Sequence, residues 1–528
     1  MLTDFAAAGL DARLQFDVCI IGGGIAGLTL AHALAGKALS VGVLEAGGRG
    51  LSEASQLFFD ADVVGAPYAG HVQGRFRALG GSSLKWGAQL LPLHPEDFDV
   101  REHVPHSGWP VGYEVLQPYY RRALALLHVD ALPFDRTLAR HLPMEPLAFD
   151  ESAFAWRYSK WARFRHRNVW ELLGPALSRS TDVHVFYHAP VVRLRLDRDS
   201  GCVTGAAVAR ADGRRVEVSA RTFVLCLGTL ETARLMLASN DVAAAGLGNE
   251  HDNVGRYFHD HLSFRAAQLV RAAPALLRAF SPRFSRQVMH YPRLELTPAA
   301  QARYGCSAAF AHLQFEHGAR SAFTAMRSVL RRLQQREWFL PRLGETVDIV
   351  TDLPYFFRLA ASFACGGRVP VPPGADRYFQ VDVEQAPNRD SRVLLGDQVD
   401  RLGMPRLRID WRITERELRT AAVFVQRLAE ECGRLAGGAI DWRSRELETL
   451  EVWRGHVHDT YHQAGTTRMA DSPAQGVVDR HLQVHGVPNV YVAGCSVFPT
   501  GGSANPTLTM MALTLRLADR LSAAKRTP

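Results

Sequence analysis

The residue types best suited to proton chemistry in the C-terminal part of the chain are a histidine and an asparagine. His462 begins the Gly/Thr-rich stretch HQAGTTRM, and Asn505 lies in GGSANPTLTMMALTLRLA, where Pro506 opens a predicted helix. An imidazole exchanges a proton near neutral pH, and a positioned one accelerates a reaction by about 10²–10⁴-fold. An Asn–Pro pair is also an ordinary helix start, with the asparagine as N-cap. The sequence leaves two interpretations open: an ordinary loop and capped helix, or two halves of one active site.

A glycine turn near the N-terminus has the order of elements that binds a dinucleotide. The apolar run 16–21, typical of a buried parallel strand, leads into Gly22, Gly24 and Gly27, a helical Leu/Ala pattern, and a second strand that ends at Glu45. Gly22 permits the turn, Gly24 lets the backbone approach a pyrophosphate, and Gly27 lets the helix pack close to the strand. Glu45 can accept hydrogen bonds from ribose hydroxyls. The unit predicts a bound dinucleotide but does not separate NAD from FAD.

The composition fits a soluble globular protein. Of the 528 residues, 22% are charged and 47% are hydrophobic, and the length favours two or more domains. The net charge of +8 comes from arginines dispersed among acidic residues, which argues against a nucleic-acid surface. The seven cysteines form no CxxC pair, so neither disulfides nor a metal site is indicated. Without a targeting signal or an apolar run of about 18 residues, we expect a cytoplasmic protein with no transmembrane segment.

Five further segments are distinctive. They are RFRALGGSSLKWGAQL, VLCLGTLETARLMLAS, NVGRYFHDHLSF, PNRDSRVLLGDQVDRLGMPRLRIDW and VHGVPNVYVAGCSVFPTGGSANPTLTMMAL. Together with the glycine turn they resemble the glucose-methanol-choline (GMC) flavin oxidoreductases, over residues 16 to about 521. The resemblance implies an α/β fold (α+β overall), in which an FAD-binding Rossmann-like domain is interleaved with a substrate domain built on an antiparallel sheet covered by helices.

The resemblance also implies FAD as the cofactor and assigns roles to residues. His462 would be the general base that removes the alcohol proton while hydride moves to flavin N5. Asn505 would hold the substrate oxygen as it becomes alkoxide-like, and the helix after it would stabilise charge on the reduced flavin. The residues expected to bind FAD are Gly22, Gly24, Gly27, Glu45, Gly80, Gly81, Ser82, Ser83, Val192, Gly228, Thr229, Gly494, Pro506 and Thr507.

One lysine and several histidines lie in or near these segments. In members of the family that resemble pyranose 2-oxidase, a histidine just before the tryptophan of this Gly/Ser segment bonds covalently to FAD. Here Lys85 stands at that place in GGSSLKW, so we expect non-covalent FAD. Lys85 would point to phosphate or solvent, or help to stabilise anionic reduced flavin. His259 and His261 are expected to pack near the cofactor or the domain seam without a chemical role, and no metal site is expected at His456 and His458.

The same placements predict how the domains are divided. The FAD-binding domain would comprise residues 14–100, 175–265 and 455–528, the last part carrying the catalytic His and Asn. Residues 101–174 would form a substrate or cap segment, and residues 266–454 the substrate-binding domain.

Residues 320–367 are the least family-like stretch. They are rich in Arg, Phe and Leu and predict two amphipathic helices around a loop. A helical cover on the substrate domain is the favoured interpretation. A substrate-entry lid and a membrane-surface or partner-docking face are the alternatives.

The function that these observations imply is oxidation of a CH–OH group to a carbonyl. The chain length and the GGSANPTLT version of the signature favour the bacterial members that act on a sugar, glycoside or related polyol. One alternative is a hydrophobic secondary alcohol such as a sterol or polyketide, which the apolar 320–367 segment would suit. Another is a catalytically silent flavin-binding partner protein. O₂, a quinone or a cytochrome would accept the electrons, and no nucleic acid is expected to bind.

Overall fold

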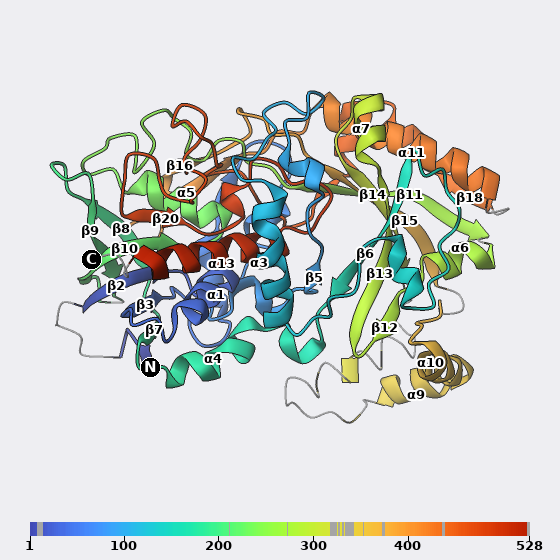
Figure 1. The fold of residues 1–528 in the computed structure, drawn as a ribbon, viewed down its shortest axis with the longest axis horizontal. Coiled ribbons are helices and arrows are strands. Elements are labelled where there is room, and N and C mark those ends of the chain that lie inside the picture. The colour runs from blue at the N-terminus through green and yellow to red at the C-terminus, as the bar shows by residue number, and fades with distance from the viewer. Residues whose placement is uncertain are drawn as a thin grey trace.

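Two large β-sheets lie side by side and carry helices on their outer faces (Figure 1). The structure is a computed structural model that describes residues 1–7, 14–210, 212–271, 273–316, 325, 328–329, 332, 340, 343–351, 353–371, 375–435 and 439–524. Among these residues, no helix has the length and apolar character that crossing a bilayer requires. The predicted α/β fold, with a Rossmann-like sheet and an antiparallel sheet, is confirmed.

The first sheet has the strand order β1-β7-β3-β2-β10-β9-β8, and β20 pairs with β10. The pairs β1–β7, β7–β3, β3–β2, β2–β10 and β10–β20 are all parallel. Strand β9 pairs antiparallel with both β10 and β8. The central strands read as almost continuous apolar runs because helices or loops cover both of their faces. The strands are β1 (Leu2–Asp4), β2 (Leu14–Ile21), β3 (Val41–Leu44), β7 (Val183–Tyr187), β8 (Val191–Leu196), β9 (Val203–Ala209), β10 (Arg215–Leu225) and β20 (Val490–Val492).

Helices from distant parts of the chain pack against this sheet. The predicted glycine-turn helix is α1 (Ile25–Leu34), and the predicted C-terminal helix is α13 (Thr507–Ala524). The two helices pack together, and α13 also packs against α3 (Tyr113–Leu126) (Figure 1). The remaining helices here are α2 (Glu53–Gln56), α4 (Val169–Arg179) and α5 (Thr229–Ala238).

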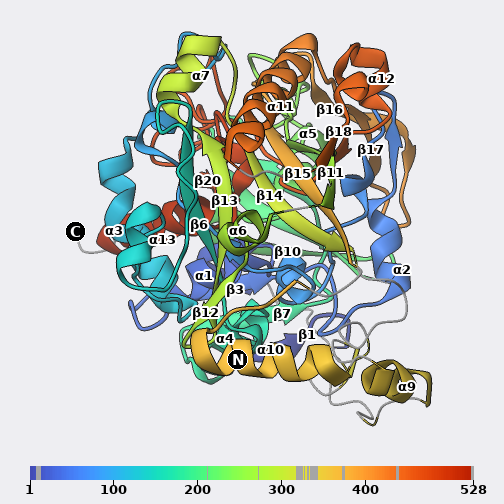
Figure 2. The same ribbon diagram turned by 90° about the vertical axis from the view of Figure 1, so that its right-hand side faces the viewer.

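The second sheet is antiparallel, with the order β18-β11-β15-β14-β13-β6-β5; β12 pairs with β13 and β19 with β11. Its long cover is α11 (Glu415–Leu435), which crosses the sheet in Figure 2. The strands are β5 (Gln89–Leu90), β6 (Phe154–Trp161), β11 (His261–Arg271), β12 (Arg283–Ser285), β13 (Val288–Leu296), β14 (Ala309–Glu316), β15 (Asp376–Glu384), β18 (Ala439–Trp442) and β19 (His458–Asp459).

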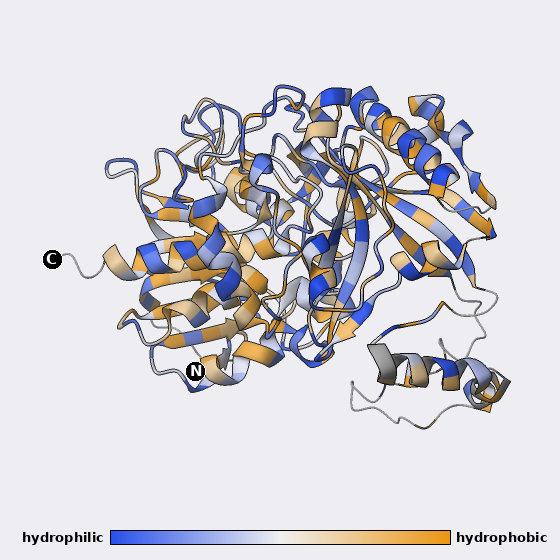
Figure 3. Ribbon diagram, turned by 45° about the vertical axis from the view of Figure 1, so that its right-hand side comes forward, coloured by the Kyte–Doolittle hydropathy of each residue, from blue (hydrophilic) through white to orange (hydrophobic). Residues whose placement is uncertain are grey.

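The two faces of the antiparallel sheet differ in polarity. Side chains such as Leu262, Leu313 and Val381 point to the α11 side and join one apolar core with that helix. Their alternate neighbours on the same strands, such as Ser263 and Asp382, are polar and yet buried. Figure 3 shows this alternation as orange and blue bands along the strands. A buried polar face is costly unless its groups are hydrogen-bonded, so this face marks the side where chemistry is expected.

The smaller elements include a strand pair within the segment PNRDSRVLLGDQVDRLGMPRLRIDW. It forms as β16 (Arg392–Val399) and β17 (Pro405–Asp410), but in a separate three-stranded sheet with β4 (Ala61–Val63). Most of residues 320–342 lie outside the described residues, and two helices follow them beyond β12 (Figures 1 and 3). The remaining helices are α6 (Pro274–Ala279), α7 (Pro298–Tyr304), α9 (Leu343–Thr351), α10 (Leu353–Gly366) and α12 (Leu450–Arg454).

Candidate active site

A cleft of about 1460 Å³, open to solvent, lies where β2, β3 and β10 end. Ligands of open α/β sheets bind beyond the carboxyl ends of the strands, so this is the expected place for a dinucleotide. The sequence reasoning did not single out Arg75, Arg77, Pro190, Val191 or Tyr461, which also line the cleft. The predicted residues that line it are Gly22, Gly24, Glu45, Gly81, Ser82, Gly228, Thr229, His462, Gly494, Pro506 and Thr507.

The glycine turn fits its predicted role atom by atom. Gly22 has a φ of +108°, and a Cβ there would lie 2.5 Å from the carbonyl oxygen of Cys226, the residue that follows β10. A Cβ at Gly27 would collide with the carbonyl oxygen of Gly22, so only glycine lets α1 approach β2 this closely. A Cβ at Gly24 would meet nothing within 4 Å, because this position faces the cleft. The turn therefore leaves open the space that a pyrophosphate needs.

Glu45 is buried at the end of β3, beside the turn. Its carboxylate accepts hydrogen bonds of 2.7 Å from the main-chain N–H groups of Gly23 and Gly47. Burial raises the pKa of Glu45, and these two hydrogen bonds oppose the rise. The remaining lone pairs are available at the wall of the cleft, where the ribose of a dinucleotide would lie.

Three helices begin at the cleft. They are α1 after Gly24, α5 after Gly228 and α13 at Thr507. No side chain caps the first two, and a Cβ at Gly228 would meet nothing within 4 Å. Helix N-termini carry unpaired N–H groups and a partial positive charge that favour anionic groups. The residues present fit FAD, whose pyrophosphate and reduced ring are anionic.

Four predicted FAD-binding residues do not line the cleft. Gly27 lies behind the turn, and Gly80 donates from its N–H to the carbonyl of Gly23 over 2.9 Å. Ser83 Oγ donates to the carbonyl of Gly80 over 2.6 Å and accepts from the N–H of Val169 over 3.0 Å. These three residues support the loops of the cleft.

Val192 is the fourth of these residues and is buried in β8. The preceding Val191 lines the cleft in its place. The β8–β9 pair has a register shift between Val191 and Arg193. Lys85 is exposed and is not among the cleft-lining residues; its Nζ lies 5.5 Å from the centre of the Phe76 ring.

His462 lines the cleft, and Asn505 lies against His462 without being one of the cleft-lining residues. Nδ2 of Asn505 lies 3.2 Å from Nε2 of His462. Oδ1 of Asn505 is buried and has no hydrogen-bond partner among the residues that the structure describes. A buried acceptor left unpaired is costly, and it indicates a partner that the protein chain does not itself supply. The structure brings the two sequence stretches together, as the single-site interpretation requires.

His261, to which the sequence reasoning gave no chemical role, contacts His462 directly. The two Nδ1 atoms are 3.0 Å apart, and Nε2 of His261 lies 2.8 Å from the carbonyl oxygen of Gly502. Nδ1 of His462 also lies 2.9 Å from Oγ1 of Thr460. The available signal was the Asp–His pair within NVGRYFHDHLSF, but nothing in its spacing from His462 predicts the contact.

Asp260 ties the same loop to the sheet. Its carboxylate accepts from the main-chain N–H groups of His462 and His261, at 2.8 and 2.7 Å. It also accepts from the hydroxyls of Thr460 and Tyr68, at 3.0 and 2.8 Å. Burial and the neighbouring Asp459 raise the pKa of Asp260 to about 7, while the hydrogen bonds it accepts oppose the rise.

The imidazole of His462 is held in its neutral form by its surroundings. Burial lowers the pKa of His462 well below the usual value, and His261 and Arg293 lower it further. A neutral imidazole has one free lone pair and can take a proton. The site therefore contains a base beside a hydrogen-bond donor, Nδ2 of Asn505, at the edge of a cleft for a dinucleotide.

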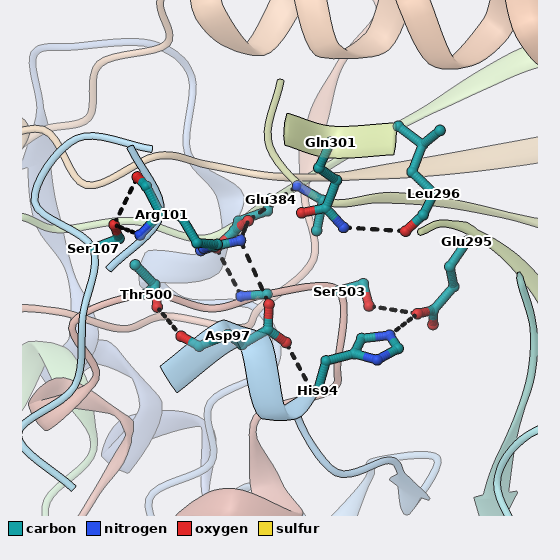
Figure 4. A network of polar contacts seen from close by, with 12 residues as sticks. His94, Asp97, Arg101, Ser107, Glu295, Leu296, Gln301, Glu384, Thr500 and Ser503 are labelled. Atoms are coloured by element: carbon teal, nitrogen blue, oxygen red, sulfur yellow. Dashed lines mark hydrogen bonds and ion pairs between the residues drawn. The ribbon is translucent and has the colours of Figure 1, made fainter. Parts of the chain in front are cut away.

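A buried network of charged groups anchors the loop that precedes Asn505 (Figure 4). Glu384 accepts from Arg101 at 2.6 Å and from the main-chain N–H of Gly502 at 2.9 Å. Glu295 accepts from the hydroxyl of Ser503 at 2.8 Å and lies 2.9 Å from Nε2 of His94. These contacts join residues that are far apart in the sequence, and no local pattern predicts them. They fix the loop against the polar face of the antiparallel sheet.

The chain is similar to known flavoproteins over most of its length. Residues 387–514 match the family model described as GMC oxidoreductase, and residues 17–244 match that of FAD dependent oxidoreductase. The fructose dehydrogenase large subunit of Gluconobacter japonicus is 23% identical over 96% of this chain and 98% of its own. The 6'''-hydroxyparomomycin C oxidase of Streptomyces lividus is 26% identical over 96% of this chain and 91% of its own. The structure of a formate oxidase of Aspergillus oryzae RIB40 superposes with a TM-score of 0.58 at 16% identity, covering 97% of this chain and 99% of that one.

Proposed function

Because this chain belongs to the GMC oxidoreductase family of FAD enzymes, we propose that it oxidises a CH–OH group of a sugar, glycoside or related polyol to a carbonyl. The observation that carries the proposal is the pair of His462 Nε2 and Asn505 Nδ2, 3.2 Å apart beside the cleft. A single substrate oxygen about 3 Å from both atoms can donate its proton to the first and accept a hydrogen bond from the second.

The protein's own groups handle the proton and the negative charge in this reaction. His462 takes the hydroxyl proton at Nε2 of a ring that burial keeps neutral. Asn505 donates from Nδ2 to the oxygen as charge develops there, the moment at which such a hydrogen bond is strongest. FAD, when bound, would supply the two-electron acceptor, and Gly22, Gly24 and Glu45 are residues that would hold it.

The polar face of the antiparallel sheet supports a substrate with several hydroxyl groups. Near His261 it carries Ser263, which hydrogen-bonds with Asp382 and accepts from Gln380 at 2.6 Å. Beside them, Nε2 of Gln314 lies 2.7 Å from Nε2 of His312. Side chains of this kind can exchange their mutual hydrogen bonds for hydrogen bonds to the hydroxyl groups of a polyol, whereas a sterol offers them few polar groups.

Two relatives support the same substrate class by their names. One is named for fructose and the other for 6'''-hydroxyparomomycin C. The apolar helices α9 and α10, the basis of the sterol alternative, lie beyond β12 and do not line the cleft.

The test is anaerobic. The purified protein is mixed with separate panels of sugars, glycosides, sterols and simple alcohols, and the visible absorbance of the oxidised flavin is followed. Bleaching by sugars or glycosides supports the proposal, and bleaching by sterols alone contradicts the substrate class. A protein that stays yellow with every panel would favour a flavin-binding partner without catalysis. Readmitting air after bleaching separates an oxidase from a dehydrogenase.

We also propose that FAD is held without a covalent bond. His462 is the one histidine among the residues that line the described cleft, and its ring is committed to Asn505 and His261. Denaturation should therefore release all of the yellow colour into the supernatant. Colour that stays with the precipitated protein would contradict this part of the proposal.

A further inference from the structure

We propose that Asp260 and His261 are positioning residues that hold His462 with its proton on Nδ1 and its lone pair on Nε2. The importance of this for the reaction rests on the proposed function, because it assumes that His462 is the base. The proton position itself follows from the hydrogen bonds and from the neutral state of the buried His261 ring. An imidazole with the opposite proton placement would present an N–H to the substrate and could not remove a proton.

The carbonyl oxygen of Gly502 determines which nitrogen of His261 carries the proton. A carbonyl oxygen only accepts hydrogen bonds, and it lies 2.8 Å from Nε2 of His261, so that nitrogen carries the proton. His261 is buried, and its burial lowers its pKa, so the ring is neutral. Its Nδ1 therefore has a free lone pair and acts as an acceptor.

That lone pair determines which ring nitrogen of His462 carries the proton. The two Nδ1 atoms are 3.0 Å apart, and His261 can only accept, so Nδ1 of His462 must donate. The hydrogen bonds of Thr460 are consistent with this assignment. Its hydroxyl donates to Asp260 over 3.0 Å and leaves an oxygen lone pair 2.9 Å from Nδ1 of His462. The neutral ring then has its lone pair on Nε2, facing the amide N–H of Asn505.

Asp260 holds the backbone that carries the ring. It accepts from the N–H of His462 and from the N–H of His261, so both histidines are attached to one carboxylate. Tyr461, between Thr460 and His462, has a φ of +64°, which is unusual for a residue with a side chain. Such a conformation persists only where the surroundings over-determine it, and the hydrogen bonds to Asp260 on either side of Tyr461 supply that constraint.

The first test is kinetic and uses three variants of the FAD-loaded enzyme. His261→Phe keeps a ring but removes the acceptor, and we expect the limiting rate of flavin reduction to fall at least about tenfold with little change in the substrate concentration for half-maximal rate. His261→Asn places an amide oxygen where Nδ1 stood and should recover most of the rate. His259→Asn is the matched control: His259 is a buried histidine in the same loop, its Nε2 has no partner, and its variant should reduce at the wild-type rate.

Three kinetic results would overturn the proposal. They are a wild-type rate in His261→Phe, a loss in His261→Phe that His261→Asn does not recover, and an equal loss in His259→Asn. If His462→Ala itself reduces at the wild-type rate, the proposed function fails instead.

The second test does not depend on activity or on the folding of any His261 variant. The FAD-loaded wild-type protein is labelled with ¹⁵N in the histidine rings, and the signals of His462 are identified by their absence in His462→Ala. A protonated Nδ1 and an unprotonated Nε2, distinguished by their couplings to the ring protons, support the proposal. A protonated Nε2 overturns it, whatever the kinetics show.

Discussion

Glu384 on the antiparallel sheet accepts a 2.9 Å hydrogen bond from the main-chain N–H of Gly502, three residues before Asn505. The residues after Asn505 belong to α13, which packs on the parallel-sheet side. The short segment 502–507 therefore spans both halves of the molecule. The position of the Asn505 amide therefore depends on both sheets. A substitution at Glu384 should displace Asn505 although the two residues are not in direct contact.

Replacing Glu384 with alanine should destabilise the protein strongly. The carboxylate is buried with Arg101, and removing one partner of a buried pair leaves an uncompensated charge at a cost of about 3–5 kcal/mol. A thermal unfolding curve should show a clearly lower midpoint. Glu151→Ala is the control, because Glu151 pairs with Arg136 in solvent and should leave the midpoint nearly unchanged. Equal midpoints for the two variants would contradict the importance of the buried pair.

His462→Ala should keep its yellow FAD and lose activity. The histidine lines one end of the cleft and makes few of its walls, so cofactor content should match the wild type. Loss of a positioned base should lower the rate of flavin reduction by more than about 10²-fold. Stopped-flow absorbance under argon measures this rate. A variant that bleaches as fast as the wild type would remove His462 from the mechanism.

Asn505 should be tested by two substitutions. Asn505→Ala removes the donor to the substrate oxygen, and we expect a loss of about ten- to a hundredfold in reduction rate. Asn505→Asp places a carboxylate next to Nε2 of His462 and should raise the pKa of that imidazole, because a negative charge favours its protonated form. The acid limb of the pH profile should then move to higher pH. Unaltered kinetics in both variants would remove Asn505 from the mechanism.

The pH profile of the wild type follows from the lowered pKa of His462. The base works in its neutral form, and burial, together with His261 and Arg293, keeps it neutral below its usual pKa of 6.5. The rate of flavin reduction should therefore stay level as the pH falls through 6.5 and decline only at more acidic values. The measurement is the reduction rate across a pH series with a stable substrate. A decline that begins above pH 7 would show that the site does not depress this pKa.

Alanine substitutions at two glycines of the turn should impair different properties of the protein, one its FAD binding and the other its stability. Gly24 has φ −82° and ψ −165°, which alanine tolerates, and a methyl group there would enter the open cleft. Gly24→Ala should fold normally but lose FAD. Gly27→Ala should be destabilised even without FAD, because its Cβ collides with the carbonyl of Gly22. Flavin content and the unfolding midpoint of the apoprotein separate the two outcomes, and equal behaviour of the variants would contradict the assignment.

The parts that the sequence predicted well are those encoded in contiguous stretches. The strand, the glycine turn and α1 follow one another, so composition and spacing were enough. The meeting of His462 and Asn505 came from family resemblance, because no local pattern reports a contact across 43 positions. Their catalytic roles and the domain boundaries stay predictions.

Some contacts and side-chain orientations could not be predicted from the sequence. They depend on packing between residues far apart in the chain and on how each strand is placed in its sheet. The contact of His261 with His462 spans 201 positions, and that of Glu384 with Gly502 spans 118. Val191 rather than Val192 lines the cleft, and alternation along one strand does not show which of its two faces meets the cleft.

The pairing of β20 with β10, together with the packing of α13 on α1, also governs when the protein can mature on the ribosome. Both elements are made after every other part of the parallel sheet. A nascent chain that already has its glycine turn still lacks the cleft wall formed by Gly494, Pro506 and Thr507. We therefore expect cofactor loading to follow synthesis of the C-terminal segment, and a chain that stops near residue 490 should not retain FAD.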